Sequence, residues 1–297
     1  MSNNFTYFFH TDYGEMHMKH SEYLKNEELK KMVRSTSKKP GGQYLTLGRW
    51  VYAFSPEFMK DKPAVAKELD GLRVAAMHNP IAYYAPNSQE QLDFINDTVP
   101  PEESPLYIIR DSNRVGKSTA SWVKMLLWLP LIETDPEWPV FKYFGIKHRP
   151  FTGPKSVGVC TYNTSKLEDP IWKEMIRKWT PDYELGVYGR TYRGKGSKWG
   201  PSWGHDRSIR LKHSKSQIGF YTYESDQGNF EGGALDAWWW DEQGKKAQFD
   251  GADRGTQTSA GVHIFSLTPH RVPGRPDTGA AGWLYAVING ANAQGQP

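Results

Sequence analysis

Residues 111–119 read Asp-Ser-Asn-Arg-Val-Gly-Lys-Ser-Thr, follow the apolar run 106–109 and precede a helical pattern. In a phosphate-binding loop, backbone N–H groups and the start of a helix face the anion. A lysine reaches the terminal phosphates, and a hydroxyl ligates magnesium. Gly116, Lys117 and Ser118 are the residue types that these three roles need. The stretch therefore predicts a loop that binds nucleotide phosphates.

Asp111 departs from the loop pattern G-x-x-x-x-G-K-[ST], because it stands where the first glycine is expected. A carboxylate there would bring negative charge toward a negative ligand, so it must point away or be neutralised. The alternative interpretation of the segment is a glycine-containing turn that begins a helix.

Residues 234–242, ALDAWWWDE, have the pattern of a buried strand that ends in two carboxylates, known as a Walker B motif. Such a strand places both groups at the carboxyl edge of a parallel sheet, where these folds bind ligands. We expect Asp241 to hold magnesium and Glu242 to orient or deprotonate the attacking water. The alternative is an acidic turn after an aromatic core strand.

Residues 262–270, VHIFSLTPH, form another β-rich run, which ends in Thr268 and a proline that cannot continue a central strand. Thr268 is therefore predicted beside the carboxylates, where its hydroxyl could sense the γ-phosphate through water or through Glu242. The alternative is a strand that Pro269 simply terminates.

Residues 86–94, PNSQEQLDF, contain a turn that leads into an amphipathic segment. A side-chain amide donates and accepts hydrogen bonds at once, as recognition of adenine requires. Gln91 is the predicted adenine reader, with Gln89 in reserve. A solvated glutamine on a helix surface is the alternative.

Together, these motifs resemble the ATPase half of a large terminase subunit, the DNA-packaging motor of tailed bacteriophages. The motifs are Gln91-x-x-Phe94, the degenerate loop at 111–119, the stretch ESDQGNFEGG at 224–233, the strand ending in Asp241 and Glu242, and Ser266-Leu267-Thr268-Pro269. The resemblance covers about residues 80–290, and its specificity lies in the combination.

The resemblance implies ATP and Mg²⁺ as cofactors, with ATP hydrolysis driving translocation of double-stranded DNA into a procapsid. It implies that Glu242 is the catalytic carboxylate and Thr268 the coupling motif. The residues expected to bind nucleotide are Gln91, Ser112, Asn113, Arg114, Val115, Gly116, Lys117, Ser118 and Thr119, with Ser118 and Asp241 as the magnesium ligands. The implied partners are DNA, a portal protein, a small terminase subunit and further copies in a ring.

Phosphoryl transfer usually needs an arginine to complete the positive charge around the phosphates. Arg114, inside the loop, could act in cis, whereas Arg254 could act on a neighbouring subunit. Either could instead be a structural ion-pair partner.

The segment between residues 190 and 215 is strongly basic and contains interleaved aromatic residues. The residues we expect to track a DNA backbone are Arg190, Arg193, Lys195 and Lys198. A solvated, glycine-rich loop is an equal alternative.

Strands and helices alternate from about residue 81, which predicts an α/β fold of the P-loop (ASCE) type with a mainly parallel sheet flanked by helices. Expected strands cover 106–110, 156–161, 234–240 and 262–267, with paired strands near 208–224 and helices over 117–129 and about 163–179. We expect three regions: a small helical lid or docking subdomain over 1–80 with helices near 21–34 and 64–77, the ATPase domain over 81–290, and a tail or linker over 291–297.

Composition favours an intracellular protein, expected in the host cytoplasm and without membrane contact. Cys160 is the only cysteine and is predicted to be a buried small side chain. No apolar run reaches the length of a membrane span. His10, His17 and His20 lack the spacing of a metal site and are expected at the surface.

The resemblance also implies a two-part protein whose second half is an RNase H-like nuclease. Too little sequence follows Thr268 for such a nuclease, so we expect no DNA cleavage. Two other functions stay open. One is another P-loop enzyme, such as a helicase or a small-molecule kinase, and the other is an assembly module that does not bind nucleotide.

Overall fold

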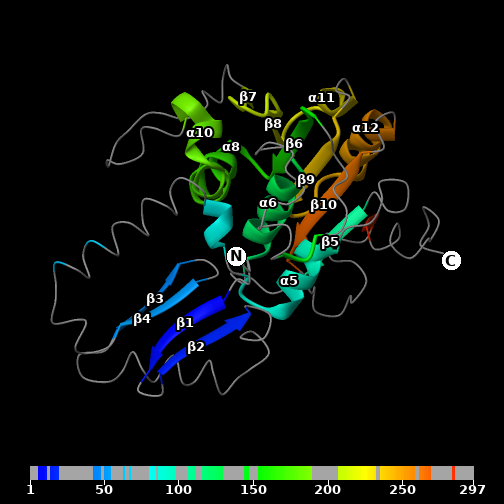
Figure 1. The fold of residues 1–297 in the computed structure, drawn as a ribbon. Coiled ribbons are helices and arrows are strands. Elements are labelled where there is room, and N and C mark those ends of the chain that lie inside the picture. The colour runs from blue at the N-terminus through cyan, green and yellow to red at the C-terminus, as the bar shows by residue number, and fades with distance from the viewer. Residues whose placement is uncertain are drawn as a thin grey trace.

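A computed structural model of the chain contains a six-stranded sheet with helices on both faces and a separate four-stranded sheet (Figure 1). The structure describes residues 6–11, 14–19, 43–47, 50–54, 63, 67, 80–84, 86–97, 106–110, 116–129, 144–146, 153–188, 207–231, 235–257, 261–268 and 283–284.

The larger sheet has the strand order β5-β10-β9-β6-β8-β7. Its strands are β5 (Leu106–Arg110), β6 (Ser156–Thr161), β7 (Ser208–Arg210), β8 (Gln217–Thr222), β9 (Ala237–Asp241) and β10 (Val262–Leu267). All neighbouring pairs are parallel except β7 with β8. Because parallel strands point the same way, the ends of β5, β10, β9 and β6 meet at one edge, and β10 lies between β5 and β9.

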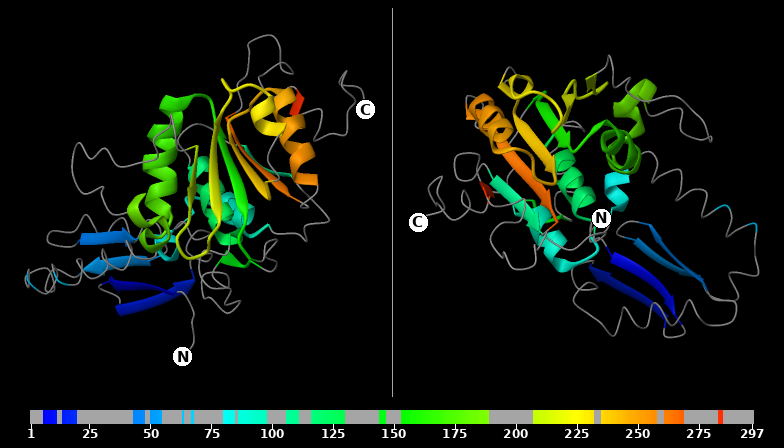
Figure 2. Two further views of the ribbon diagram at one scale, coloured as in Figure 1. Left: turned by 90° about the horizontal axis from the view of Figure 1, so that it is seen from above. Right: turned by 180° about the vertical axis from the view of Figure 1, so that it is seen from behind.

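Helices cover both faces of this sheet (Figure 2, left). One face carries α5 (Gln89–Asn96), α6 (Lys117–Trp128) and the consecutive helical segments α8 (Thr164–Lys166), η2 (Leu167–Ile176) and α9 (Arg177–Trp179). The other carries α11 (Gly228–Glu231) and α12 (Lys246–Gln257). The short helices η1 (Pro80–Tyr83), α10 (Asp182–Leu185) and η3 (Gly186–Tyr188) complete this part of the chain.

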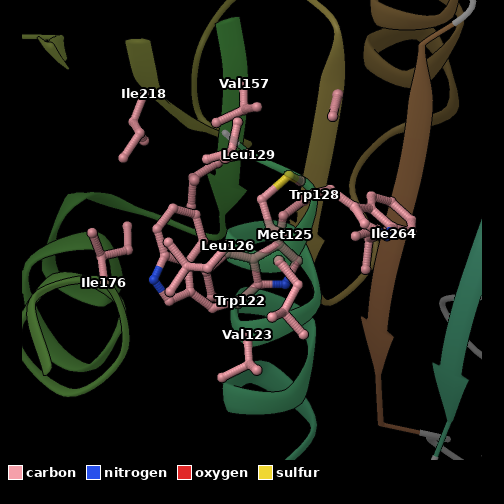
Figure 3. Close-up of a cluster of buried hydrophobic side chains, with 14 of the residues drawn as sticks. Trp122, Val123, Met125, Leu126, Trp128, Leu129, Val157, Ile176, Ile218 and Ile264 are labelled. Carbon is pink, nitrogen blue, oxygen red and sulfur yellow. The ribbon is translucent and has the colours of Figure 1, made fainter. Parts of the chain in front are cut away.

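Three consecutive tryptophans in β9 show how one strand serves both faces. Trp239 packs against Trp122 of α6, with ring centroids 5.8 Å apart. Trp238 and Trp240 point the other way and stack with Phe230 of α11. Side chains alternate along a strand, so an unbroken aromatic run requires helices on both sides. Figure 3 shows the core around Trp122 and Trp128 on the α6 face.

The predicted elements of the larger sheet are confirmed, with ends that differ by three residues or fewer for its parallel strands and for α6. Asn163 is the N-cap of the predicted helix over 163–179, because its side chain accepts the Lys166 N–H at 2.9 Å. The α/β fold with a mainly parallel, helix-flanked sheet is therefore as predicted.

The prediction of a helical N-terminal subdomain is wrong for its described strands. They are β1 (Thr6–Thr11), β2 (Gly14–Lys19), β3 (Gln43–Leu47) and β4 (Trp50–Phe54), in the order β2-β1-β4-β3. The sequences TYFFHT and WVYAF are rich in β-branched and aromatic residues, a strand signal that the prediction missed. Residues 21–34 lie outside the described part, and in 64–77 only Lys67 is described, as helical.

Several smaller predictions can also be compared with the structure. Cys160 is fully buried, as predicted, and burial raises the pKa of its thiol. His10 and His17 lie in β1 and β2, where side chains are not described, and His20 and the tail lie outside the described residues. Among the described residues, no helix is long and apolar enough to cross a membrane.

A buried lysine joins α5 to α6. Lys124 has no exposed surface, and its Nζ donates to the carbonyls of Phe94 and Asp97 at 2.5 Å each. Its ammonium also lies 4.1 Å from the centre of the Tyr107 ring. Burial lowers the pKa of Lys124 to about 7, although the nearby Asp97 carboxylate opposes this shift.

We predict that Lys124 makes the stability of the protein increase with pH. Because its pKa is about 7 in the folded chain and 10.5 as a free side chain, the unfolded chain holds more protons between these values. The free energy of unfolding should therefore rise by about 2 kcal/mol from pH 7 to pH 9 relative to Lys124→Met. Urea titrations at both pH values measure this difference. Lys178→Met, at an exposed position, should match the native chain.

Candidate active site

Gly116 is the N-cap of α6 and has a φ of +90°, in the left-handed region that favours glycine. A Cβ at this position would lie 2.7 Å from Nδ2 of Asn87 and 3.4 Å from Nε2 of Gln91. The start of α5 therefore packs directly on the end of the predicted phosphate loop. Residues 111–115, which include Asp111, Ser112, Asn113, Arg114 and Val115, lie outside the described part of the chain.

The three residues after Gly116 form the first turn of α6 and face different surroundings. Lys117 is 6% exposed. Ser118 Oγ donates a hydrogen bond of 2.6 Å to Oδ1 of Asp241, 123 residues later in the chain. Thr119 Oγ1 instead contacts Sδ of Met175 in η2 at 3.0 Å. Ser118 therefore faces the acidic strand, whereas Thr119 packs on a neighbouring helical segment.

Asp241 ends β9 and accepts hydrogen bonds from three hydroxyl groups. Besides the bond from Ser118, Oδ1 accepts Ser266 Oγ of β10 at 3.2 Å, and Oδ2 accepts Thr161 Oγ1 of β6 at 3.3 Å. Each donor comes from a different element at the carboxyl edge of the sheet. The carboxylate is thus fixed from three sides.

Burial raises the pKa of Asp241, and the neighbouring Glu242 carboxylate raises it further. The hydrogen bonds from Ser118, Ser266 and Thr161 oppose this shift, because they stabilise the charged form. Burial has the larger effect, so the charged form of Asp241 carries a net desolvation cost. A bound cation would relieve that cost.

The oxygen atoms of Ser118 and Asp241 are of the chemical type that Mg²⁺ prefers. They are hydrogen-bonded to each other at 2.6 Å, whereas adjacent ligands of an octahedral Mg²⁺, at bond lengths of about 2.1 Å, lie roughly 3 Å apart, so the two groups would have to separate slightly to bind the ion. Within the described ranges, no three His, Cys, Asp or Glu side chains are grouped to hold a metal.

Glu242 follows β9 and is held by the end of β10. The Thr268 N–H donates to its Oε2 at 2.8 Å, and Thr268 Oγ1 donates to its Oε1 at 2.5 Å. The Glu242 N–H donates to the Ser266 carbonyl at 2.9 Å. Thr268 therefore lies beside the carboxylates, where the sequence placed it, and contacts Glu242 directly.

Gln91 lies in α5 and is only 2% exposed. Its Oε1 accepts the Asn87 N–H at 2.9 Å and lies 3.5 Å from the Tyr84 hydroxyl. The predicted adenine reader is thus next to Gly116, but its amide oxygen has protein partners. Gln89, the reserve candidate, is more exposed and donates to Asp93 at 2.7 Å.

Arg254 lies on α12, away from the edge that carries Asp241. Its guanidinium is exposed and pairs with Glu231 of α11 at 2.6 Å. The backbone carbonyl of Thr256, near the end of α12, accepts the N–H of Gly261, which immediately precedes β10. This bond shows that α12 runs back toward the amino edge of the sheet. The structure therefore separates Arg254 from the site of its own chain.

The basic segment is described only in part. Arg190, Arg193, Lys195 and Lys198 lie outside the described residues. Four exposed basic residues just before β7, at its end and in the turn after it continue the segment, and they are Arg207, Arg210, Lys212 and Lys215. The buried Glu184 carboxylate fixes this turn by accepting the N–H groups of His213 and Ser214.

Sequence reasoning missed Thr161 and Tyr223, and it named Ser266 only within a motif, without its contact to Asp241. Thr161 and Ser266 hold Asp241, and Tyr223 Oη donates to the backbone carbonyls of Asp241 and Glu242. A hydroxyl at or near the carboxyl end of a buried parallel strand is a signal that could have identified Thr161 and Ser266. Tyr223 follows β8, and the sequence holds no comparable signal for it.

Comparisons with known proteins gave structural similarities only. No family model and no curated protein matches the chain. The solved structures that are similar include the large terminase from a thermophilic bacteriophage, with a TM-score of 0.38, 15% identity, and coverage of 61% of this chain and 39% of that chain. The same terminase in complex with ADP has a TM-score of 0.38 and 16% identity, and the match covers 60% of this chain and 38% of that one. This chain therefore spans well under half of these terminases.

We predict that Ser118→Ala raises the pKa of Asp241 above its native value, because the shortest hydrogen bond to the charged carboxylate is lost. Carbon-13 NMR titration of the aspartate side chains measures the change. Thr161→Val removes a longer bond, of 3.3 Å, and should raise the same pKa by less. A larger effect from Thr161→Val would contradict the assignment of Ser118 as the main donor.

Proposed function

We propose that this chain is the ATP-hydrolysing motor domain of a viral terminase large subunit, which drives double-stranded DNA into a procapsid. The observation that carries this proposal is the hydrogen bond between Ser118 and Asp241. It brings the end of the predicted phosphate loop and the acidic strand to one edge of a parallel sheet, where such folds bind ligands. The order of motifs along the chain supports the terminase assignment in particular.

The residues at this edge divide the chemistry between them. Lys117, at the start of α6, neutralises charge on the β- and γ-phosphates, and the helix N-terminus adds partial positive charge. Ser118 and Asp241 would hold Mg²⁺, which would neutralise charge on the transferred phosphoryl group. Glu242 orients a water molecule in line with the leaving oxygen and accepts its proton. Gln91 is proposed to recognise adenine.

Thr268 provides a route from hydrolysis to movement. Its N–H and hydroxyl both bind the Glu242 carboxylate, so a change in what Glu242 binds would alter its contact with Thr268. The segment after β10 would then respond to whether the γ-phosphate is present or has been hydrolysed. This contact supports a coupling role for Thr268.

A ring of subunits is proposed from the terminase resemblance and not from the position of Arg254, because in the structure Arg254 is an ion-pair partner of Glu231, the alternative role that the sequence left open. Arg254 is exposed and lies away from the Asp241 edge, so it could complete the charge around a phosphate only in a neighbouring copy. Arg114 remains the candidate for action within one chain. A portal protein and a small terminase subunit are the further partners proposed for such a ring in the host cytoplasm.

The function predicts separate effects for two substitutions. Glu242→Gln should bind ATP normally and hydrolyse it at least about 100-fold more slowly, because the general base is lost while the side-chain shape is kept. Lys117→Ala should weaken ATP binding itself. Calorimetry and phosphate release, with and without duplex DNA, measure the two effects.

Lys178→Ala is the matched control, because Lys178 is an exposed lysine on α9, and it should behave like the native chain. Normal hydrolysis by Lys117→Ala would refute the loop assignment. A native chain that binds no ATP would favour the assembly module, and hydrolysis that DNA does not stimulate would favour another P-loop enzyme.

We also predict that Lys195 and Lys198 contact duplex DNA. Replacing both with alanine should weaken binding and reduce the slope of log affinity against log salt concentration by about two, roughly one for each lost phosphate contact. Fluorescence anisotropy at several salt concentrations measures the slope. Lys246→Ala, at an exposed lysine of α12, is the control. Unchanged binding by the double variant would remove this segment from the DNA path.

A further inference from the structure

Tyr223 is a buried tyrosine with no role in the chemistry described above, and two elements fix its backbone. Its N–H donates to the Thr161 carbonyl at 2.9 Å, at the end of β6. Its carbonyl accepts the side-chain amide of Gln248, on α12, at 3.1 Å. Gln248 is itself 1% exposed and also binds the Ser225 carbonyl at 2.9 Å. These hydrogen bonds therefore fix the backbone position from which the Tyr223 side chain extends.

The Tyr223 hydroxyl reaches the backbone that follows β9. It donates to the carbonyl of Glu242 at 2.6 Å and to that of Asp241 at 3.0 Å. Gly244 leaves room for the ring, since a Cβ there would lie 2.7 Å from Cε1 of Tyr223. The ring is thus enclosed so that its one polar atom meets the two carbonyls.

The backbone of Glu242, whose carbonyl accepts this hydrogen bond, is strained. Glu242 has a φ of +66°, in the left-handed region that non-glycine residues rarely adopt. Such a conformation persists only where the surroundings hold it. Here the N–H of Glu242 is held by Ser266, its carboxylate by Thr268 and its carbonyl by Tyr223.

We propose that Tyr223 is a positioning residue whose hydroxyl holds Glu242 in this left-handed conformation and so sets the direction of its carboxylate. Ser266 and Thr268 belong to β10 and its end, whereas Tyr223 approaches from β8 on the other side of β9. Without the hydroxyl, the carbonyl of Glu242 loses its shortest hydrogen bond and the backbone can relax. The catalytic consequence rests on the proposed function, but the effect on the backbone does not.

Tyr223→Phe tests the catalytic part, because it removes the hydroxyl and keeps the ring. We expect kcat for ATP hydrolysis to fall about tenfold while KM for ATP stays within about twofold, since Lys117 and Ser118 are untouched. Tyr221→Phe is the matched control. Tyr221 lies two residues earlier, on the same face of the sheet, and packs on Trp238. It should keep native kinetics.

Amide hydrogen exchange tests the positioning itself without ATP. The N–H groups of Glu242 and Thr268 are both hydrogen-bonded in the structure, and both should exchange about tenfold faster in Tyr223→Phe. Amides of the β6 and β8 ladder should keep their native rates. Gly244→Ala, which displaces the ring, should accelerate the same two amides.

Unchanged exchange at Glu242 and Thr268 in Tyr223→Phe would overturn the proposal, as would an equal acceleration in Tyr221→Phe. Loss of the whole fold in Tyr223→Phe would also overturn it, because the hydroxyl would then serve the core rather than Glu242. A native chain that fails to hydrolyse ATP would refute the proposed function, while the exchange experiment would still decide the role of Tyr223.

Discussion

The site depends on one geometric constraint, the parallel arrangement of β5, β10 and β9. Because these strands point the same way, the helix that follows β5 and the acids that follow β9 lie at the same edge. The inserted strand β10 supplies Ser266 to Asp241 and is followed by Thr268, which binds Glu242. An antiparallel β9 would have carried both acids to the opposite edge.

Asp241 and Glu242 are adjacent in sequence but are held in different ways. Asp241 is fixed by three hydroxyls that partly offset the cost of its burial. Glu242 is turned away by its left-handed backbone and bound by Thr268. Two neighbouring carboxylates thereby obtain separate positions and separate partners, as their proposed roles of ion ligand and general base require.

The aromatic run in β9 gives this edge a rigid support. Trp238 and Trp240 stack with Phe230 and with each other on one face, where Trp240 also stacks with Phe265, while Trp239 packs on Trp122 of α6 on the other face. Large aromatic side chains bury much apolar surface in defined geometry, so the strand that positions both acids is anchored on both sides. Lys124 extends this support to α5 by holding the carbonyls at its end.

Sequence alone determined the parallel sheet, most of its strand boundaries, and the approach of Ser118, Asp241 and Thr268. These follow from periodicity and from the rule that parallel strands share a carboxyl edge. It did not find the strands within residues 1–80. Only the tertiary structure decided that Thr161 and Ser266 hold Asp241, that Tyr223 supports the Glu242 backbone, and that Arg254 faces away from its own site. Those facts depend on which strands become neighbours and where helices return, and no local pattern of residues contains that information.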